Sequence, residues 1–145
     1  MRFEDFHEGQ ILKPGSFTLN QQEILDFAKA YDPQWFHTDI ETAATGPYNG
    51  LIASGWHTCS KAMRLVVDAF LKDSHSVGSP GLAYLKWPAP VRPGDVIDTR
   101  VTIKQVRTSS SKPDVGIMVC QWQAFNQEQV EVLDLQATIF FDLTN

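Results

Sequence analysis

The sequence is poor in cysteine and contains no long apolar run. The two cysteines among its 145 residues are Cys59, in an apolar helical pattern, and Cys120, in an apolar strand pattern. We therefore predict two buried free thiols and no disulfide, which is typical of the reducing cytosol. No apolar stretch reaches the ~20 residues that span a bilayer, and the acidic start, residues 1–5, lacks the apolar run of a signal peptide. We expect a cytoplasmic protein that does not contact a membrane.

The chain also lacks an excess of positive charge. Its net charge is -5, which argues against a nucleic-acid partner because such proteins present a basic surface. Four histidines and two cysteines show no metal-ligand spacing, so no metal is expected. Among the histidines, His7 and His75 are predicted to be solvated, and His57 to be structural or to line a pocket.

The length and composition predict one domain over residues 1–145 that is large enough to bury its own core. The composition is 43% hydrophobic and 20% charged, and a chain of this size buries ~68% of its unfolded surface.

Two helices are predicted in the first half of the chain. One covers residues 20–31, where Asn20 and Glu23 form a capping box, and Pro33 ends it with Asp32 at the exit. The other runs from about Ser54 or Gly55 to about Lys72. It is apolar around most of its circumference, which indicates a helix enclosed by other structure.

Strands dominate the second half. Residues 17–19 form a possible short strand, and the polar, glycine- and serine-rich residues 73–81 are predicted to be a loop. Longer strands are expected over residues 82–87, 96–106, 115–125 and 130–142, and the last three alternate apolar and polar side chains as in an antiparallel sheet with one buried face. The sequence thus predicts an α+β fold in which the sheet curls around the apolar helix, the hot-dog fold.

A carboxylate and an imidazole, Asp32 and His37, lie five positions apart between the two helices. Such a pair can act as a general acid and base, although an aspartate before proline often only caps a turn. The backbone N–H of Gly55, at the start of the second helix, is placed to stabilise a developing negative charge. Asp39 is expected to cap a helical turn, and Asp95 to hold a turn before a strand.

Three segments resemble the MaoC-like dehydratases, single-domain relatives of the (R)-specific enoyl-CoA hydratases. Residues 32–39 read D-P-Q-W-F-H-T-D against the family's D-x-N-P-x-H-x-D. Residues 50–55 read G-L-I-A-S-G against G-x-I-A-H-G, and residues 90–95 read P-V-R-P-G-D as in the family. The departures are Gln34 and Trp35 in place of Asn-Pro, Tyr31 in place of a frequent glycine, and Ser54 in place of histidine.

This resemblance implies the reversible addition of water to a trans-2-enoyl thioester of coenzyme A or of an acyl-carrier protein. Asp32 and His37 would be the catalytic pair, and the Gly55 N–H would bind the thioester oxygen. The residues expected to contact the substrate are Ser54, Trp35, Phe36 and Trp56. No cofactor is implied beyond the coenzyme A of the substrate, and a homodimer or higher homo-oligomer is expected, with the thioester tunnel at the subunit interface.

The phosphates of coenzyme A would need local positive charge. Candidates are Lys86, Arg92, Arg107 and Lys112, each of which, taken singly, is better explained as an ordinary surface charge. Two other functions remain open. One is a thioesterase, although the apolar helix has no glutamate and its aspartate, Asp68, lies near the far end. The other is a non-catalytic acyl-thioester-binding subunit, against which the presence of both Asp32 and His37 argues.

Overall fold

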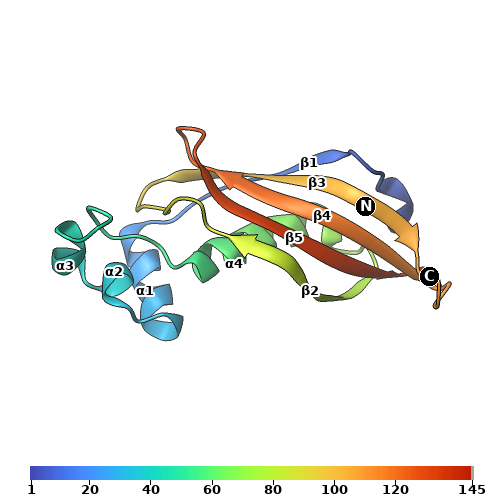
Figure 1. The fold of residues 1–145 in the computed structure, drawn as a ribbon, viewed down its shortest axis with the longest axis horizontal. Coiled ribbons are helices and arrows are strands. Elements are labelled where there is room, and N and C mark those ends of the chain that lie inside the picture. The colour runs from blue at the N-terminus through green and yellow to red at the C-terminus, as the bar shows by residue number, and fades with distance from the viewer. Residues whose placement is uncertain (145) are drawn as a thin grey trace.

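The structure is a computed structural model that describes residues 1–144. It consists of one long-stranded sheet, one central helix and a group of short helices at one end (Figure 1). In chain order the elements are the 3-10 helix η1 (Phe3–Asp5), β1 (Ile11–Thr18), α1 (Gln21–Tyr31), α2 (Trp35–Thr38), α3 (Ile40–Ala44), α4 (Gly55–Val66), the π-helix η2 (Val67–Leu71), β2 (Ser76–Lys86), β3 (Val96–Thr108), β4 (Val115–Phe125) and β5 (Glu131–Asp142).

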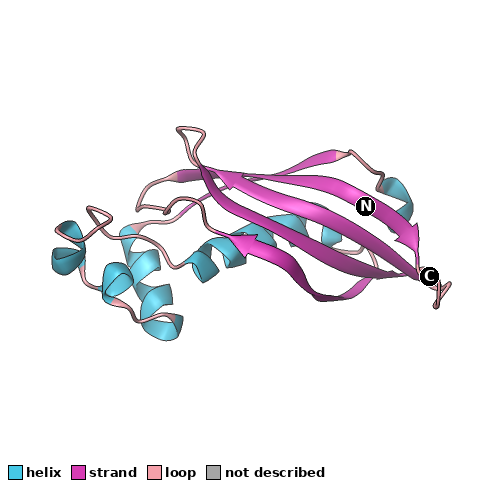
Figure 2. Ribbon diagram, viewed as in Figure 1, coloured by secondary structure: helices cyan, strands magenta, loops and turns pink. Residues whose placement is uncertain are grey.

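All neighbouring strands pair antiparallel, in the order β1-β3-β4-β5-β2. The sheet curves over α4, and α1, α2 and α3 lie together beyond one end of it (Figure 2). This is the predicted α+β architecture of a hot-dog domain. The order leaves β1 and β2 as the two edge strands.

The core lies between the concave face of the sheet and α4. The alternation predicted for the three long strands is confirmed, since Ile97, Val101, Met118, Leu133 and Phe141 are all buried. From the helix, Ala62 and Val66 reach this core. Two apolar residues of α4, Trp56 and Met63, are instead exposed, so the core covers only part of the helix.

Local sequence signals explain α1 well. The Asn20 side chain accepts a hydrogen bond from the Glu23 N–H at 2.8 Å, and the Glu23 carboxylate accepts one from the Asn20 N–H at 3.1 Å. This is the predicted capping box. Asp32 is the C-terminal capping residue, which confirms its place at the helix exit.

Three predicted boundaries were wrong. Strand β1 starts at Ile11 and not at Phe17, and the helix predicted to reach Lys72 changes at Val67 into the π-helix η2. Residues 73–81 are not a simple loop, because β2 begins at Ser76. Gly78 and Gly81 have positive φ angles there and the register with β5 shifts, so this half of β2 has neither the composition nor the alternation of a regular strand.

Candidate active site

Asp32 and His37 meet at the end of the molecule that carries the short helices. Asp32 follows α1, and His37 is buried on α2, a helix that the sequence did not predict. Nε2 of His37 lies 3.2 Å from Oδ2 of Asp32. The two residues proposed as a pair are therefore in direct contact.

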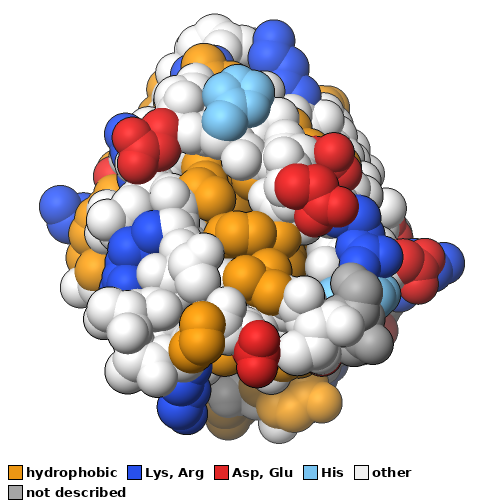
Figure 3. Space-filling model, turned by 90° about the vertical axis from the view of Figure 1, so that its right-hand side faces the viewer, with side chains coloured by type: hydrophobic (Ala, Val, Ile, Leu, Met, Phe, Trp, Pro, Cys, Tyr) orange, Lys and Arg blue, Asp and Glu red, His pale blue; other side chains and the backbone are white. Residues whose placement is uncertain are grey.

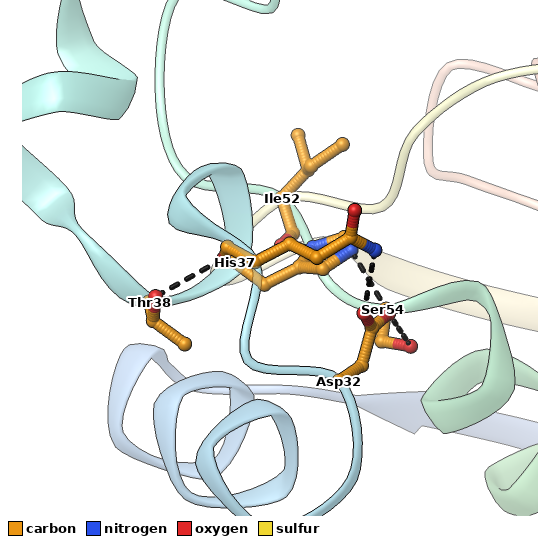
Figure 4. A network of polar contacts seen from close by, with 6 residues as sticks. Asp32, His37, Thr38, Ile52 and Ser54 are labelled. Atoms are coloured by element: carbon orange, nitrogen blue, oxygen red, sulfur yellow. Dashed lines mark hydrogen bonds and ion pairs between the residues drawn. The ribbon is translucent and has the colours of Figure 1, made fainter.

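Three further groups hold this pair in place (Figure 4). The carbonyl oxygen of Ile52 accepts a hydrogen bond of 2.7 Å from Nδ1 of His37. Because a carbonyl can only accept, Nδ1 carries a proton and Nε2 is the nitrogen left to exchange one. The Ser54 hydroxyl donates to Oδ2 of Asp32 at 2.8 Å, and the Gln34 amide donates to Oδ1 at 2.6 Å.

These contacts favour the ionised form of Asp32. Burial acts to raise the pKa of this carboxyl. The hydrogen bonds from Gln34 and Ser54, together with the nearby His37, outweigh that effect and hold the pKa below its usual value. At neutral pH Asp32 is therefore a carboxylate, and it lies next to the His37 ring.

A cavity of about 360 Å³ opens beside His37. Besides His37, its walls include the turn at Tyr48, the start of α4 at Gly55 and Thr58, residues 87–91 after β2, and Val132 on β5. As the first residue of α4, Gly55 has a backbone N–H without an acceptor inside the helix. The cavity thus brings His37, the imidazole of the pair, together with a helix N-terminus, an arrangement suited to a reaction that builds charge on an oxygen.

The predicted bend at residues 90–95 supports this site from the side. The Ala53 N–H donates to the carbonyl of Val91 at 2.8 Å, which joins the bend to the segment before α4. The carboxylate of Asp95 closes the bend by accepting from the Arg92 N–H at 2.9 Å, as predicted. Asp39 likewise accepts from the Thr42 N–H at 3.1 Å and caps α3.

None of the four residues expected to contact the substrate is among those that line the cavity. Phe36 packs edge-on against His37 and near Tyr48. Ser54 is fully buried behind the pair and bonded to Asp32. Trp35 packs against Phe36 and covers Gly46, and Trp56 is exposed on α4.

The four cationic candidates fall into two groups. Lys86 and Arg92 flank residues 87–91, which line the cavity. Arg107 lies roughly 35 Å along β3 from Val96 by strand rise, and Lys112 is in the following loop, at the opposite end of the sheet (Figure 1). Acidic and basic side chains alternate on that end around an apolar area (Figure 3). The chain therefore does not bring Arg107 and Lys112 to its own cavity.

Sequence reasoning missed several groups of the site. The carbonyl of Ile52 has no side-chain signature, and Trp87 and Tyr48 come from turns with no chemical pattern of their own. The position of Gln34 inside the motif, two residues after Asp32, is the one signal that was available.

Within residues 1–144 no three potential metal ligands cluster and no helix is long and apolar enough to cross a membrane. Cys59 and Cys120 are free thiols, as predicted, but only Cys120 is buried, whereas Cys59 is half-buried.

Known proteins resemble this chain along its whole length. A MaoC-like dehydratase from Rhodospirillum rubrum superposes with a TM-score of 0.90 and 34% identity, over 98% of this chain and 97% of that one. The uncharacterized protein YdeM of Bacillus subtilis is 27% identical over 96% of this chain and 97% of its own length.

A shorter match involves a protein whose activity is named. The 3-hydroxyacyl-thioester dehydratase Z of Mycobacterium tuberculosis is 38% identical over 53% of this chain. The match covers about half (52%) of that relative's own length. The model of the MaoC-like domain matches residues 2–119. That span includes Asp32, His37, Gly55 and the bend at residues 90–95, and the chain belongs to the MaoC-like domain family.

Proposed function

We propose that this protein catalyses the reversible hydration of a trans-2-enoyl thioester to the 3-hydroxyacyl thioester. The observation that carries the proposal is the contact between Asp32 and His37 beside a cavity that also holds the start of α4. The named activity of dehydratase Z, a 3-hydroxyacyl-thioester dehydratase, belongs to the same class of reaction.

In the proposed mechanism a water molecule binds between Asp32 and Nε2 of His37. The Asp32 carboxylate accepts a proton as the water oxygen attacks the β-carbon. Nε2 of His37, 3.2 Å away, takes up that proton and passes it to the α-carbon, so the pair returns to its starting state. Both transfers take place on one face of the double bond, so the addition is syn. No external oxidant or cofactor is needed, because water is added and no electrons are exchanged.

Negative charge builds on the thioester oxygen during the attack. The Gly55 N–H at the N-terminus of α4 stabilises that charge, with help from the helix dipole. In the reverse direction the same groups expel the hydroxyl from the β-carbon as water. Coenzyme A or an acyl-carrier protein would carry the acyl group, with Arg92 and Lys86 as the cations next to the cavity.

We also propose that two copies associate through β2. This strand is an edge of the sheet with an unpaired side, and it carries the exposed apolar residues Val77 and Leu82. An exposed apolar edge strand is a pairing surface for a second chain. Pairing two β2 strands would extend the sheet across a homodimer and place both cavities near the interface.

The activity is tested by adding crotonyl-CoA and following the loss of its conjugated ultraviolet absorbance. Asp32→Ala and His37→Ala are each expected to lower the rate by ~10²-fold or more, the usual scale for a positioned acid or base. Release of free thiol from saturated acyl-CoA, with no loss of enoyl absorbance, would instead identify a thioesterase. Full hydratase activity in both variants would contradict the assignment of the pair.

A further inference from the structure

Trp87, the first residue after β2, covers the start of α4. A Cβ atom added at Gly55 would lie 2.3 Å from Cε2 and 2.7 Å from Nε1 of the Trp87 indole. Real side-chain atoms do not approach so closely, so the indole occupies the volume that any side chain at position 55 would need. Trp87 also lines the cavity that contains His37.

The same indole contacts two other residues of α4. It packs edge-on against Trp56, with ring centroids 5.3 Å apart and an interplanar angle of 79°, and its N–H is hydrogen-bonded to the Cys59 sulfur. Trp56 and Cys59 both belong to a second hollow, of about 430 Å³, between α4 and the sheet. This hollow is lined mainly by apolar side chains, among them Met63, Leu82, Leu85 and Leu135.

Trp87 therefore contacts the catalytic cavity through Gly55 and the apolar hollow through Trp56 and Cys59. Its side chain is not required to fill the core, because the residue is 40% exposed. A large aromatic ring held in position between two hollows acts as a wall. An apolar hollow suits an acyl chain and not the phosphorylated end of coenzyme A.

We propose that Trp87 determines the acyl-chain specificity of the enzyme by separating the catalytic cavity from the apolar hollow. This inference rests on the proposed function. With the indole in place, the acyl chain ends at Trp87 and short-chain thioesters are preferred. Without it, a long chain continues past Gly55 into the hollow between α4 and β2.

Binding of saturated acyl-CoAs tests this inference separately from catalysis. The dissociation constants of butyryl-CoA and decanoyl-CoA are measured by calorimetry for the wild type, Trp87→Ala and Trp87→Phe. Trp87→Ala should shift the affinity ratio towards decanoyl-CoA by at least ~10-fold, the lower end of what one methylene is worth in a hydrophobic pocket. Trp87→Phe keeps an aromatic wall and should stay near the wild-type ratio.

Urea unfolding shows whether each variant is folded. If Trp87→Ala does not fold, Trp87→Leu takes its place. The inference is overturned if the affinity ratio of the alanine or leucine variant stays within about twofold of the wild-type ratio. This holds even if the enzyme hydrates crotonyl-CoA. A shifted ratio without any hydratase activity would support the wall and contradict the proposed reaction. If neither acyl-CoA binds to the wild type, both proposals fail.

Discussion

The hydroxyl of Ser54 donates a hydrogen bond of 2.8 Å to Oδ2 of Asp32, the same oxygen that lies 3.2 Å from Nε2 of His37. Ser54 thus sets the orientation of the carboxylate without lining the cavity itself. The related family motif has a histidine at this position, so the contact is a feature of this chain's own sequence. The bond is also one of the influences that lower the pKa of Asp32.

Ser54→Ala should therefore weaken the positioning of the carboxylate. Because hydrogen bonds to charged groups are worth about 1.5–3 kcal/mol, we expect kcat/KM for crotonyl-CoA to fall by ~10-fold or more. The pKa of Asp32 should rise, so the acid limb of the pH–rate profile should move to higher pH.

A matched control is available on the sheet. Ser16→Ala removes another serine hydroxyl that donates to an aspartate, Asp98, at 3.1 Å. It should change neither the rate nor the pH profile. An unshifted acid limb in Ser54→Ala would show that the hydroxyl does not tune Asp32.

Gly55→Ala should force the Trp87 indole to move, since the new Cβ atom would overlap it. Overpacking of this kind costs about 1–3 kcal/mol of unfolding free energy, which urea denaturation measures. The cost should be much smaller when Trp87 is already alanine. Equal costs in the two backgrounds would mean that the contact between Gly55 and Trp87 is not the reason for glycine at position 55.

The parts of the fold that could be predicted are those specified by neighbouring residues. The capping box of α1 needs only Asn20 and Glu23, and the alternation of β3, β4 and β5 repeats within each strand. The first half of β2 was missed because its glycines and serines form a strand only when paired with β5.

The residues of the site also divide into those with a local sequence signal and those without one. Asp32, His37 and Gly55 carry chemical types that indicate a role, and their spacing resembles a family motif. The Ile52 carbonyl and the indole of Trp87 reach the site through tertiary packing, and neither has a local signal. Gln34 and Ser54 are departures from the motif, but their hydrogen bonds to Asp32 depend on the turn after α1.

Stability should fall in mild acid because of His57. Its ring is buried and stacked on Phe27 with centroids 4.3 Å apart. Burial lowers the pKa of His57, Lys61 lowers it further, and Glu23 opposes them. The unfolded chain thus binds the proton more tightly than the folded one. The contribution of His57 is fully present above its unfolded pKa of about 6.5 and is lost as the pH falls towards the folded value.

This prediction is checked by urea unfolding at about pH 7.5 and about pH 5.5. His57→Phe keeps an aromatic ring against Phe27 but cannot be protonated, so it should lose less stability over this interval than the wild type. Both proteins retain Asp32 and His37, so any difference between their losses reports on His57. Identical losses would mean that His57 does not contribute.

Arg92→Ala should weaken binding of the substrate through its phosphates. We expect KM for crotonyl-CoA to rise with little change in kcat, since a cation outside the reacting centre binds substrate and transition state alike. The crotonyl thioester of N-acetylcysteamine has no phosphate, and its KM should not change. Lys112→Ala serves as a control, because Lys112 lies at the far end of the sheet. Equal effects on both thioesters would exclude a phosphate contact.

The proposed dimer is tested at the edge strands. Leu82 on β2 is 47% exposed, and Ile11 on the opposite edge strand β1 is 56% exposed. Light scattering should give the mass of a dimer for the wild type and of a monomer for Leu82→Lys, because a lysine in the joined region would bury an unpaired charge. Ile11→Lys introduces the same charge on β1 and should remain dimeric. Dissociation of Ile11→Lys but not of Leu82→Lys would place the interface on β1, and a monomeric wild type would exclude the dimer.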